Sequence, residues 1–173
     1  MPNFRSKFEG RVWANARKKG WKIEYEPDTI GFLSSVVGGA CGACGSSEVV
    51  KKVKYTPDFK LCGWIYVESK GKFDSKARSR LSDFLDTHGA RYDIRILFQR
   101  DNWTTKRHRE RYSDWCERKG VKYAVGEEIP EEWYKEALDY SNGTLPKALQ
   151  EAPERGRVHN HSRAPKFQPR KRS

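Results

Sequence analysis

The chain has 173 residues, which suits one domain of ordinary size. Hydrophobic residues make up 36% of it and aromatic residues 13%, so it can bury a core. Lys and Arg number 35 against 23 Asp and Glu, and the resulting formal net charge of +12 favours a polyanionic partner such as nucleic acid. No apolar run approaches the roughly 20 residues of a membrane span, and the first residues lack a signal-peptide pattern, so we expect a protein of the cytoplasm with no membrane partner.

Hydrophobic spacing and turn residues predict a mixed α/β chain. In chain order, we expect a helix at 6–19, a strand at 21–25, a Gly- and Ser-rich loop or bridging segment at 31–47, paired strands at 49–55 and 62–70, a helix at 74–88, a strand at 93–99, a helix at 112–119, a strand at 121–124 and a helix opened by Pro130.

Composition and hydrophobic spacing also predict the domain organisation. Residues 1–150 are expected to form one domain, in which 31–50 is a bridging insertion. Residues 151–173 are rich in Pro, Arg, Lys and His without periodicity, which predicts a disordered basic tail.

One stretch carries the clearest chemistry, Pro57-Asp58 followed after a turn by Glu68-Ser69-Lys70. Glu68 and Lys70 are two apart on a predicted strand, so both side chains leave the same face, and an antiparallel hairpin would bring Asp58 beside them. Two converging carboxylates suit a hard cation such as Mg²⁺, and a neighbouring ammonium suits hydrolysis of a phosphodiester. The alternative from spacing alone is a turn aspartate beside a solvated Glu–Lys pair.

The wider sequence favours the catalytic interpretation. The Pro-Asp…Glu-x-Lys pattern resembles the core of the restriction-endonuclease-like nuclease superfamily, and the surrounding sequence resembles one branch of it, the phage endonuclease I resolvases. This resemblance covers roughly Phe4 to Glu136, in ordered blocks at 5–9, 23–26, 55–59, 67–71, 93–98, 112–117 and 129–133.

The resemblance implies a restriction-endonuclease-like mixed sheet flanked by helices, in an intertwined, strand-exchanged homodimer. It implies metal ligation by Asp58 and Glu68 and a catalytic role for Lys70, and it adds Glu9, which would reach these residues from the partner chain. Glu9 also fits a structural role as the last member of a Ser6 capping box.

Basic side chains would hold DNA by its phosphates, so that shape and not base sequence is recognised. The candidates for this contact are Arg5, Lys7, Arg11, Arg95, Lys106 and Arg107. Each is individually as well explained as a solvated surface charge.

The bridging insertion contains Cys41-Gly42-Ala43-Cys44, which looks like half of a structural zinc site. A second close pair is missing, because Cys62 and Cys116 are isolated. Zinc binding, free thiols and, least favoured in a reducing compartment, a disulfide stay open. The longer bridge also bears on strand exchange, because linker length changes its reach.

We therefore expect a Mg²⁺- or Mn²⁺-dependent endodeoxyribonuclease that resolves Holliday junctions and other branched DNA in the cytoplasm of a phage-infected host cell. Two alternatives stay open. One is a nuclease of the same superfamily for single strands, flaps or mismatches. The other is a non-catalytic, basic nucleic-acid-binding protein with zinc at Cys41 and Cys44.

Overall fold

The computed structural model describes residues 2–37, 48–89 and 91–143. In this part of the chain, helices and strands follow in the order α1 (Lys7–Lys18), β1 (Ile23–Tyr25), β2 (Ile30–Val37), β3 (Glu48–Tyr55), β4 (Phe59–Leu61), β5 (Ile65–Lys70), α2 (Ser75–His88), β6 (Asp93–Phe98), α3 (Tyr112–Lys119), β7 (Tyr123–Val125) and α4 (Glu131–Ser141).

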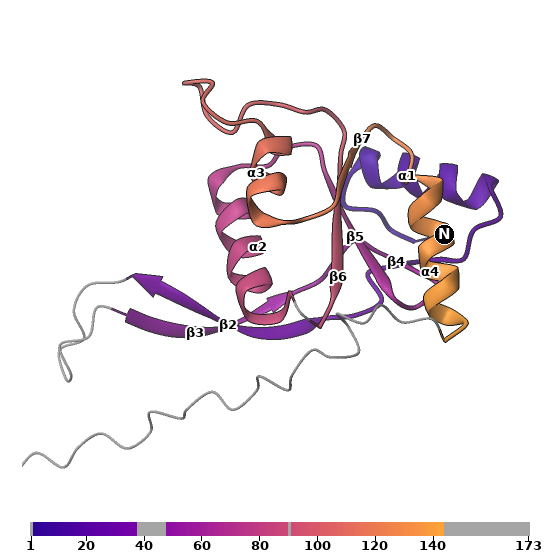
Figure 1. Cartoon of the computed structure of the whole chain (residues 1–173), viewed down its shortest axis with the longest axis horizontal. Helices are drawn as coiled ribbons and strands as arrows, with labels where there is room; N and C mark the ends of the chain where they lie inside the picture. Colours follow the sequence, from indigo (N-terminus) through magenta and orange to yellow (C-terminus); the bar gives the residue numbers. More distant parts are fainter. Residues whose placement is uncertain (1, 38–47, 90, 144–173) are drawn as a thin grey trace, which may run out of the picture.

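The centre of the fold is a five-stranded mixed sheet in the order β1-β4-β5-β6-β7. β1, β4 and β5 are antiparallel neighbours, whereas β5, β6 and β7 run parallel. β2 and β3 form a separate antiparallel ribbon, paired from Ile30 with Tyr55 to Val37 with Glu48. Figure 1 shows this ribbon lying beneath α2 and extending away from the sheet.

Helices cover both faces of the sheet (Figure 1). α1 and α4 pack on one face through buried side chains such as Val12 and Trp133. α2 and α3 pack on the other through Phe84 and Trp115. The central strands are consequently buried on both sides, as parallel strands in α/β folds usually are.

Local signals explain where several helices begin and end. The Ser6 side chain accepts a hydrogen bond from the Glu9 N–H and caps α1, and Asp74 caps α2 through the Ala77 N–H. Gly120 ends α3 in the left-handed conformation, with φ of 66°, which glycine adopts at no steric cost.

The expected mixed α/β order is confirmed, with two corrections. Residues 31–47 were expected to be a loop or bridging segment, but β2 occupies 30–37, where Ile30 and Phe32 point into the core, and 38–47 lie outside the described residues. Strands 49–55 and 62–70 were expected to pair, but β3 pairs with β2, and β5 pairs with β4 and β6.

Other expectations lie outside the described residues, namely those on Cys41, Cys44 and the tail at 151–173. Across 2–37, 48–89 and 91–143, no helix is both long and apolar enough to span a bilayer.

Candidate active site

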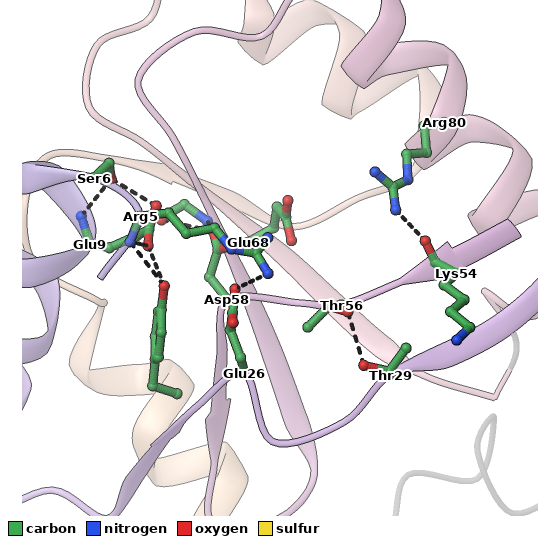
Figure 2. Close-up of polar contacts among 12 residues, drawn as sticks. Arg5, Ser6, Glu9, Glu26, Thr29, Lys54, Thr56, Asp58, Glu68 and Arg80 are labelled. Atoms are coloured by element: carbon green, nitrogen blue, oxygen red, sulfur yellow. Dashed lines mark hydrogen bonds and ion pairs between the residues drawn. The ribbon is translucent and has the colours of Figure 1, made fainter. Parts of the chain in front are cut away.

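A cleft of about 550 Å³ opens at the end of β5, where α1, β3 and α2 meet. Its volume lies within the range of ligand-binding clefts. It contains all four residues expected to be catalytic, and its full lining is Arg5, Glu9, Thr29, Lys54, Tyr55, Thr56, Asp58, Glu68, Lys70, Ala77, Arg80 and Leu81. Figure 2 shows most of these side chains around Asp58 and Glu68.

The β4–β5 hairpin places Asp58 beside β5, as the sequence predicts. Asp58 lies directly before β4, and the next residue, Phe59, pairs with Val67. Asp58 Oδ2 therefore accepts two hydrogen bonds from Ser69, one from the backbone N–H at 2.7 Å and one from the hydroxyl at 2.8 Å. Asp58 is thereby fixed in orientation, and its Oδ1 accepts no hydrogen bond from any described residue.

Glu68 is also fixed in orientation by its contacts. It lies on the opposite side of the β5 backbone from Ser69. It is only 5% exposed, and its Oε2 accepts a hydrogen bond of 2.8 Å from the buried Tyr55 hydroxyl. Its Oε1 forms an ion pair with Lys70 Nζ. The two-residue spacing on the strand puts Glu68 and Lys70 on the same face, which confirms their predicted juxtaposition.

Glu9 lines the cleft from the first turn of α1 and is also the capping-box member expected of it, while its catalytic role stays a prediction. Its N–H donates to Ser6 Oγ, and its Oε1 accepts from the same hydroxyl at 2.7 Å. Its Oε2 accepts from the Tyr25 hydroxyl at 2.7 Å and from the Arg5 N–H at 3.0 Å. In the structure Glu9 meets Asp58, Glu68 and Lys70 of its own chain.

Asp58 and Glu68 together carry more negative charge than Lys70 alone balances. Burial, and then the charge of Glu68, raise the pKa of Asp58 to about 7 against the opposing effects of Lys70 and Ser69. Burial lowers the pKa of Lys70, but the charges of Glu68 and Asp58 outweigh it and hold that pKa above its usual value. Lys70 is therefore a cation at neutral pH.

This donor set fits a divalent cation of the Mg²⁺ type. Such ions prefer oxygen ligands and are usually held by one or two carboxylates together with water and substrate phosphate. Asp58 and Glu68 supply two carboxylates, and a bound cation would offset the burial and the Glu68 charge that raise the Asp58 pKa. Within the described part of the chain, no three Asp, Glu, His or Cys side chains already form a metal-sized cluster, so ligation by Glu9 stays a prediction.

The cations expected to contact DNA lie in different places. Arg5 lines the cleft, and Lys7 is exposed at the start of α1. Arg11 donates to Glu127 at 2.8 Å, so its charge is partly balanced. Lys106 and Arg107 are exposed on the connection between β6 and α3.

Arg95 is a correction to that set. Its side chain is fully buried and forms ion pairs with Asp93 at 2.7 Å and Glu136 at 2.5 Å. Its guanidinium also lies over the Trp133 ring, 5.4 Å from the centroid. A buried and paired guanidinium has no access to a DNA phosphate, so Arg95 belongs to the core.

Sequence reasoning missed several side chains of the cleft. Three hydroxyl donors each serve one carboxylate: Tyr25 for Glu9, Tyr55 for Glu68 and Ser69 for Asp58. Tyr55 lies two residues before Pro57 and Ser69 lies within the Glu68-x-Lys70 pattern, and this proximity is the signal that could have drawn attention to them. Lys54 and Arg80 had no such signal.

Comparisons with known proteins agree with the earlier resemblance. A family model described as Phage endonuclease I matches residues 1–150. Endonuclease I of Escherichia phage T7 is 32% identical over 136 residues, which are 77% of this chain and 79% of that protein. Endodeoxyribonuclease 1 of Enterobacteria phage T3 is 30% identical over 122 residues, which are 70% of each chain.

Proposed function

This chain belongs to the phage endonuclease I family, and we propose that it is an endodeoxyribonuclease that resolves four-way junctions and other branched DNA by metal-dependent hydrolysis. The observation that carries the proposal is the cleft that gathers Asp58, Glu68 and Lys70. The positive net charge of +12 supports a polyanionic substrate. The expected setting is the cytoplasm of an infected cell.

Asp58 and Glu68 would hold Mg²⁺ or Mn²⁺, with Glu9 as a third carboxylate at the same cleft. When bound, the ion supplies Lewis acidity toward the phosphate and lowers the pKa of a water molecule. Ser69 and Tyr55 keep the two carboxylates in fixed orientations through their hydrogen bonds.

Lys70 would orient the attacking water and offset negative charge that develops on the phosphate oxygens. The water oxygen forms a new bond to phosphorus, and the bond from phosphorus to the 3′ oxygen breaks. A proton moves from the water to the solvent, and the departing 3′ oxygen takes one up. The products bear 5′-phosphate and 3′-hydroxyl ends.

We propose further that the protein acts as a strand-exchanged homodimer. Resolution of a four-way junction needs two symmetric cuts, and a twofold dimer supplies two equivalent clefts. The chains would cross within the bridging insertion expected at 31–50.

The test is cleavage of an end-labelled four-way junction beside its component linear duplex, with Mg²⁺ and with EDTA. Metal-dependent paired cuts near the branch point, with the duplex mostly spared, are expected. Competition with flaps and single strands tests the preference for junctions. Tight binding without cutting at any divalent-metal concentration would refute the nuclease proposal.

The site assignment has its own test. Glu68→Ala and Lys70→Ala should abolish cutting while junction binding persists. Lys72→Ala is the matched control, because it removes the same charge two residues farther on, at an exposed position outside the cleft lining. Undiminished cutting by either cleft variant would rule out the assignment.

A further inference from the structure

The cleft has a second end whose side chains the proposed chemistry does not use. Lys54 comes from the end of β3 and Arg80 from α2, whereas Thr29 precedes β2 and Thr56 follows β3. Figure 2 shows these four residues on one side of Asp58 and Glu68, with Glu9 and Arg5 on the other. The cleft is therefore one continuous surface with two chemically different ends.

The second end carries uncompensated positive charge. Lys54 and Arg80 are exposed, and neither forms an ion pair with any residue that the structure describes. Arg80 Nη2 donates to the Lys54 backbone oxygen, which anchors the guanidinium and leaves its other N–H groups available. At the catalytic end, by contrast, Lys70 is paired with Glu68.

Two hydroxyl groups also lie at the second end. Thr29 Oγ1 and Thr56 Oγ1 are 3.1 Å apart, so one donates to the other. The accepting hydroxyl keeps its own hydrogen for an additional acceptor. An ammonium, a guanidinium and a hydroxyl donor together suit the oxygens of a phosphate group.

We infer that Lys54 and Arg80, with the Thr29–Thr56 pair, bind a backbone phosphate of the DNA strand next to the phosphate that is cut. This inference rests on the proposed function, because a strand with one phosphate at Asp58 and Glu68 carries neighbouring phosphates along the cleft. The basic end attracts a neighbouring phosphate that the acidic end repels. The site thereby fixes the register of the strand relative to the catalytic residues without reading bases.

The test is the salt dependence of junction binding by full-length Arg80→Ala and Lys54→Ala in EDTA. The logarithm of affinity falls linearly with the logarithm of salt concentration, and each phosphate contact contributes about 0.9 to the slope. Because Lys54 and Arg80 contact the same phosphate, each single variant should lose up to about 0.9 of slope and bind all branched DNA sequences more weakly.

The chain offers a matched control for each variant. Arg78→Ala removes a guanidinium from the same helix, where Arg78 donates to the Phe73 backbone oxygen and lies outside the cleft lining. Lys52→Ala removes an exposed ammonium from the same strand, also outside that lining. Because the loss of net charge is equal within each pair, a difference in slope reports a local contact.

Equal slopes within both pairs would overturn the inference. A fall in the thermal midpoint of Arg80→Ala with an unchanged slope would also overturn it, because the guanidinium would then only anchor β3 to α2. Wild-type cleavage is measured in parallel. If the wild type does not cut DNA but the slopes fall as expected, the phosphate site stands while the proposed function fails.

Discussion

Replacing Asp58 with asparagine should stabilise the metal-free protein above pH 7. Burial, and then the charge of Glu68, raise the pKa of Asp58 from 3.8 to about 7. Between these values the folded state keeps a proton that the unfolded chain releases, so stability falls as the pH rises from about 4 to about 7 and stays low above it. Each pKa unit corresponds to about 1.4 kcal/mol, so the penalty is at most about 4 kcal/mol.

The assay is thermal unfolding in EDTA between pH 4 and pH 9. Asparagine carries no charge, and its side-chain oxygen can still accept from Ser69. The gap between Asp58→Asn and the wild type should widen from pH 4 to pH 7 and then stay constant. A stability change of 1 kcal/mol moves the midpoint of a domain this size by roughly 2–4 °C, so the full gap is at most about 8–16 °C.

Asp28→Asn is a control for which the expected change in stability has the opposite sign. Hydrogen bonds from Lys60 and Tyr66 lower the pKa of Asp28, so its charge stabilises the fold above pH 4, and that stability is lost as the pH falls through the folded pKa. Asp28→Asn should therefore be less stable than the wild type at neutral pH. If Asp58→Asn gains nothing at pH 8, or gains as much at pH 4, burial and the charge of Glu68 do not raise the Asp58 pKa as argued.

Divalent metal adds a second measurement on the same proteins. A ligand that binds only the folded state raises its stability by mass action. Mg²⁺ should therefore raise the unfolding midpoint of the wild type more than that of Asp58→Asn. Equal shifts would argue against Asp58 as a metal ligand, independently of any cleavage assay.

Three further predictions concern residues around the cleft and beyond it. Tyr55→Phe removes the hydroxyl donor of Glu68 and should raise the Mg²⁺ concentration needed for half-maximal cutting by about 10–100-fold, whereas an unchanged requirement would contradict the orienting role. Arg95→Ala leaves Asp93 without its ion-pair partner and Glu136 with Lys122 alone, and should cost about 3–5 kcal/mol, measured as a lower urea midpoint. Weaker DNA binding by a variant of unchanged stability would instead indicate that Arg95 contacts a DNA phosphate. Replacing Lys106 and Arg107 together with alanine should lower the salt slope of junction binding by about 1.8, and an unchanged slope would exclude both from the DNA interface.

Much of the fold was predictable because local signals and tertiary packing agree. α3 has the predicted bounds, Tyr112–Lys119, since buried Trp115 and Cys116 mark its inner face and Gly120 its end. β2 was missed because Gly31 and Ser34 resemble loop residues, although Ile30 and Phe32 alternate toward the core. β4 has only three residues, too few to show a period.

The candidate site was predictable only where chemistry and spacing coincide. Glu68 and Lys70 share a strand face, so their juxtaposition follows from the pleat. Lys54 and Arg80 lie on different elements, and only the packing of α2 against the ribbon brings them together. Arg95 was misjudged because the alternation of side chains along β6 predicts that one face of the strand is exposed to solvent. In the structure α4 covers that face.

The position of Glu9 in the sequence lets either its own chain or a strand-exchanged partner supply it to the cleft. α1, β1 and β2 all precede residues 38–47, and Asp58, Glu68 and Lys70 all follow them. An exchange of everything before residue 38 between two chains would keep the β2–β3 register and every contact of Glu9 in the cleft. The contacts within one chain are therefore the same ones that a strand-exchanged dimer would make between chains.

Heterodimers of two inactive variants distinguish a Glu9 that acts within its own chain from a Glu9 that acts in the cleft of the partner chain. Glu9→Ala and Lys70→Ala chains are co-expressed with different tags, and heterodimers are isolated through both tags. If Glu9 acts on the partner, one cleft of each heterodimer has every group, so single-strand nicking of the junction returns, as we predict. If Glu9 acts within its own chain, each cleft lacks one group and nothing is cut.

The matched control combines Glu68→Ala with Lys70→Ala. Both changes follow residues 38–47, so no cleft is complete in either arrangement, and restored nicking by this pair would point to contaminating wild-type enzyme. Each variant must also be inactive alone, since an active Glu9→Ala homodimer would remove Glu9 from the catalytic set. Failure of the two tags to co-purify would refute the dimer itself, because two symmetric cuts by one bound assembly require two clefts in it.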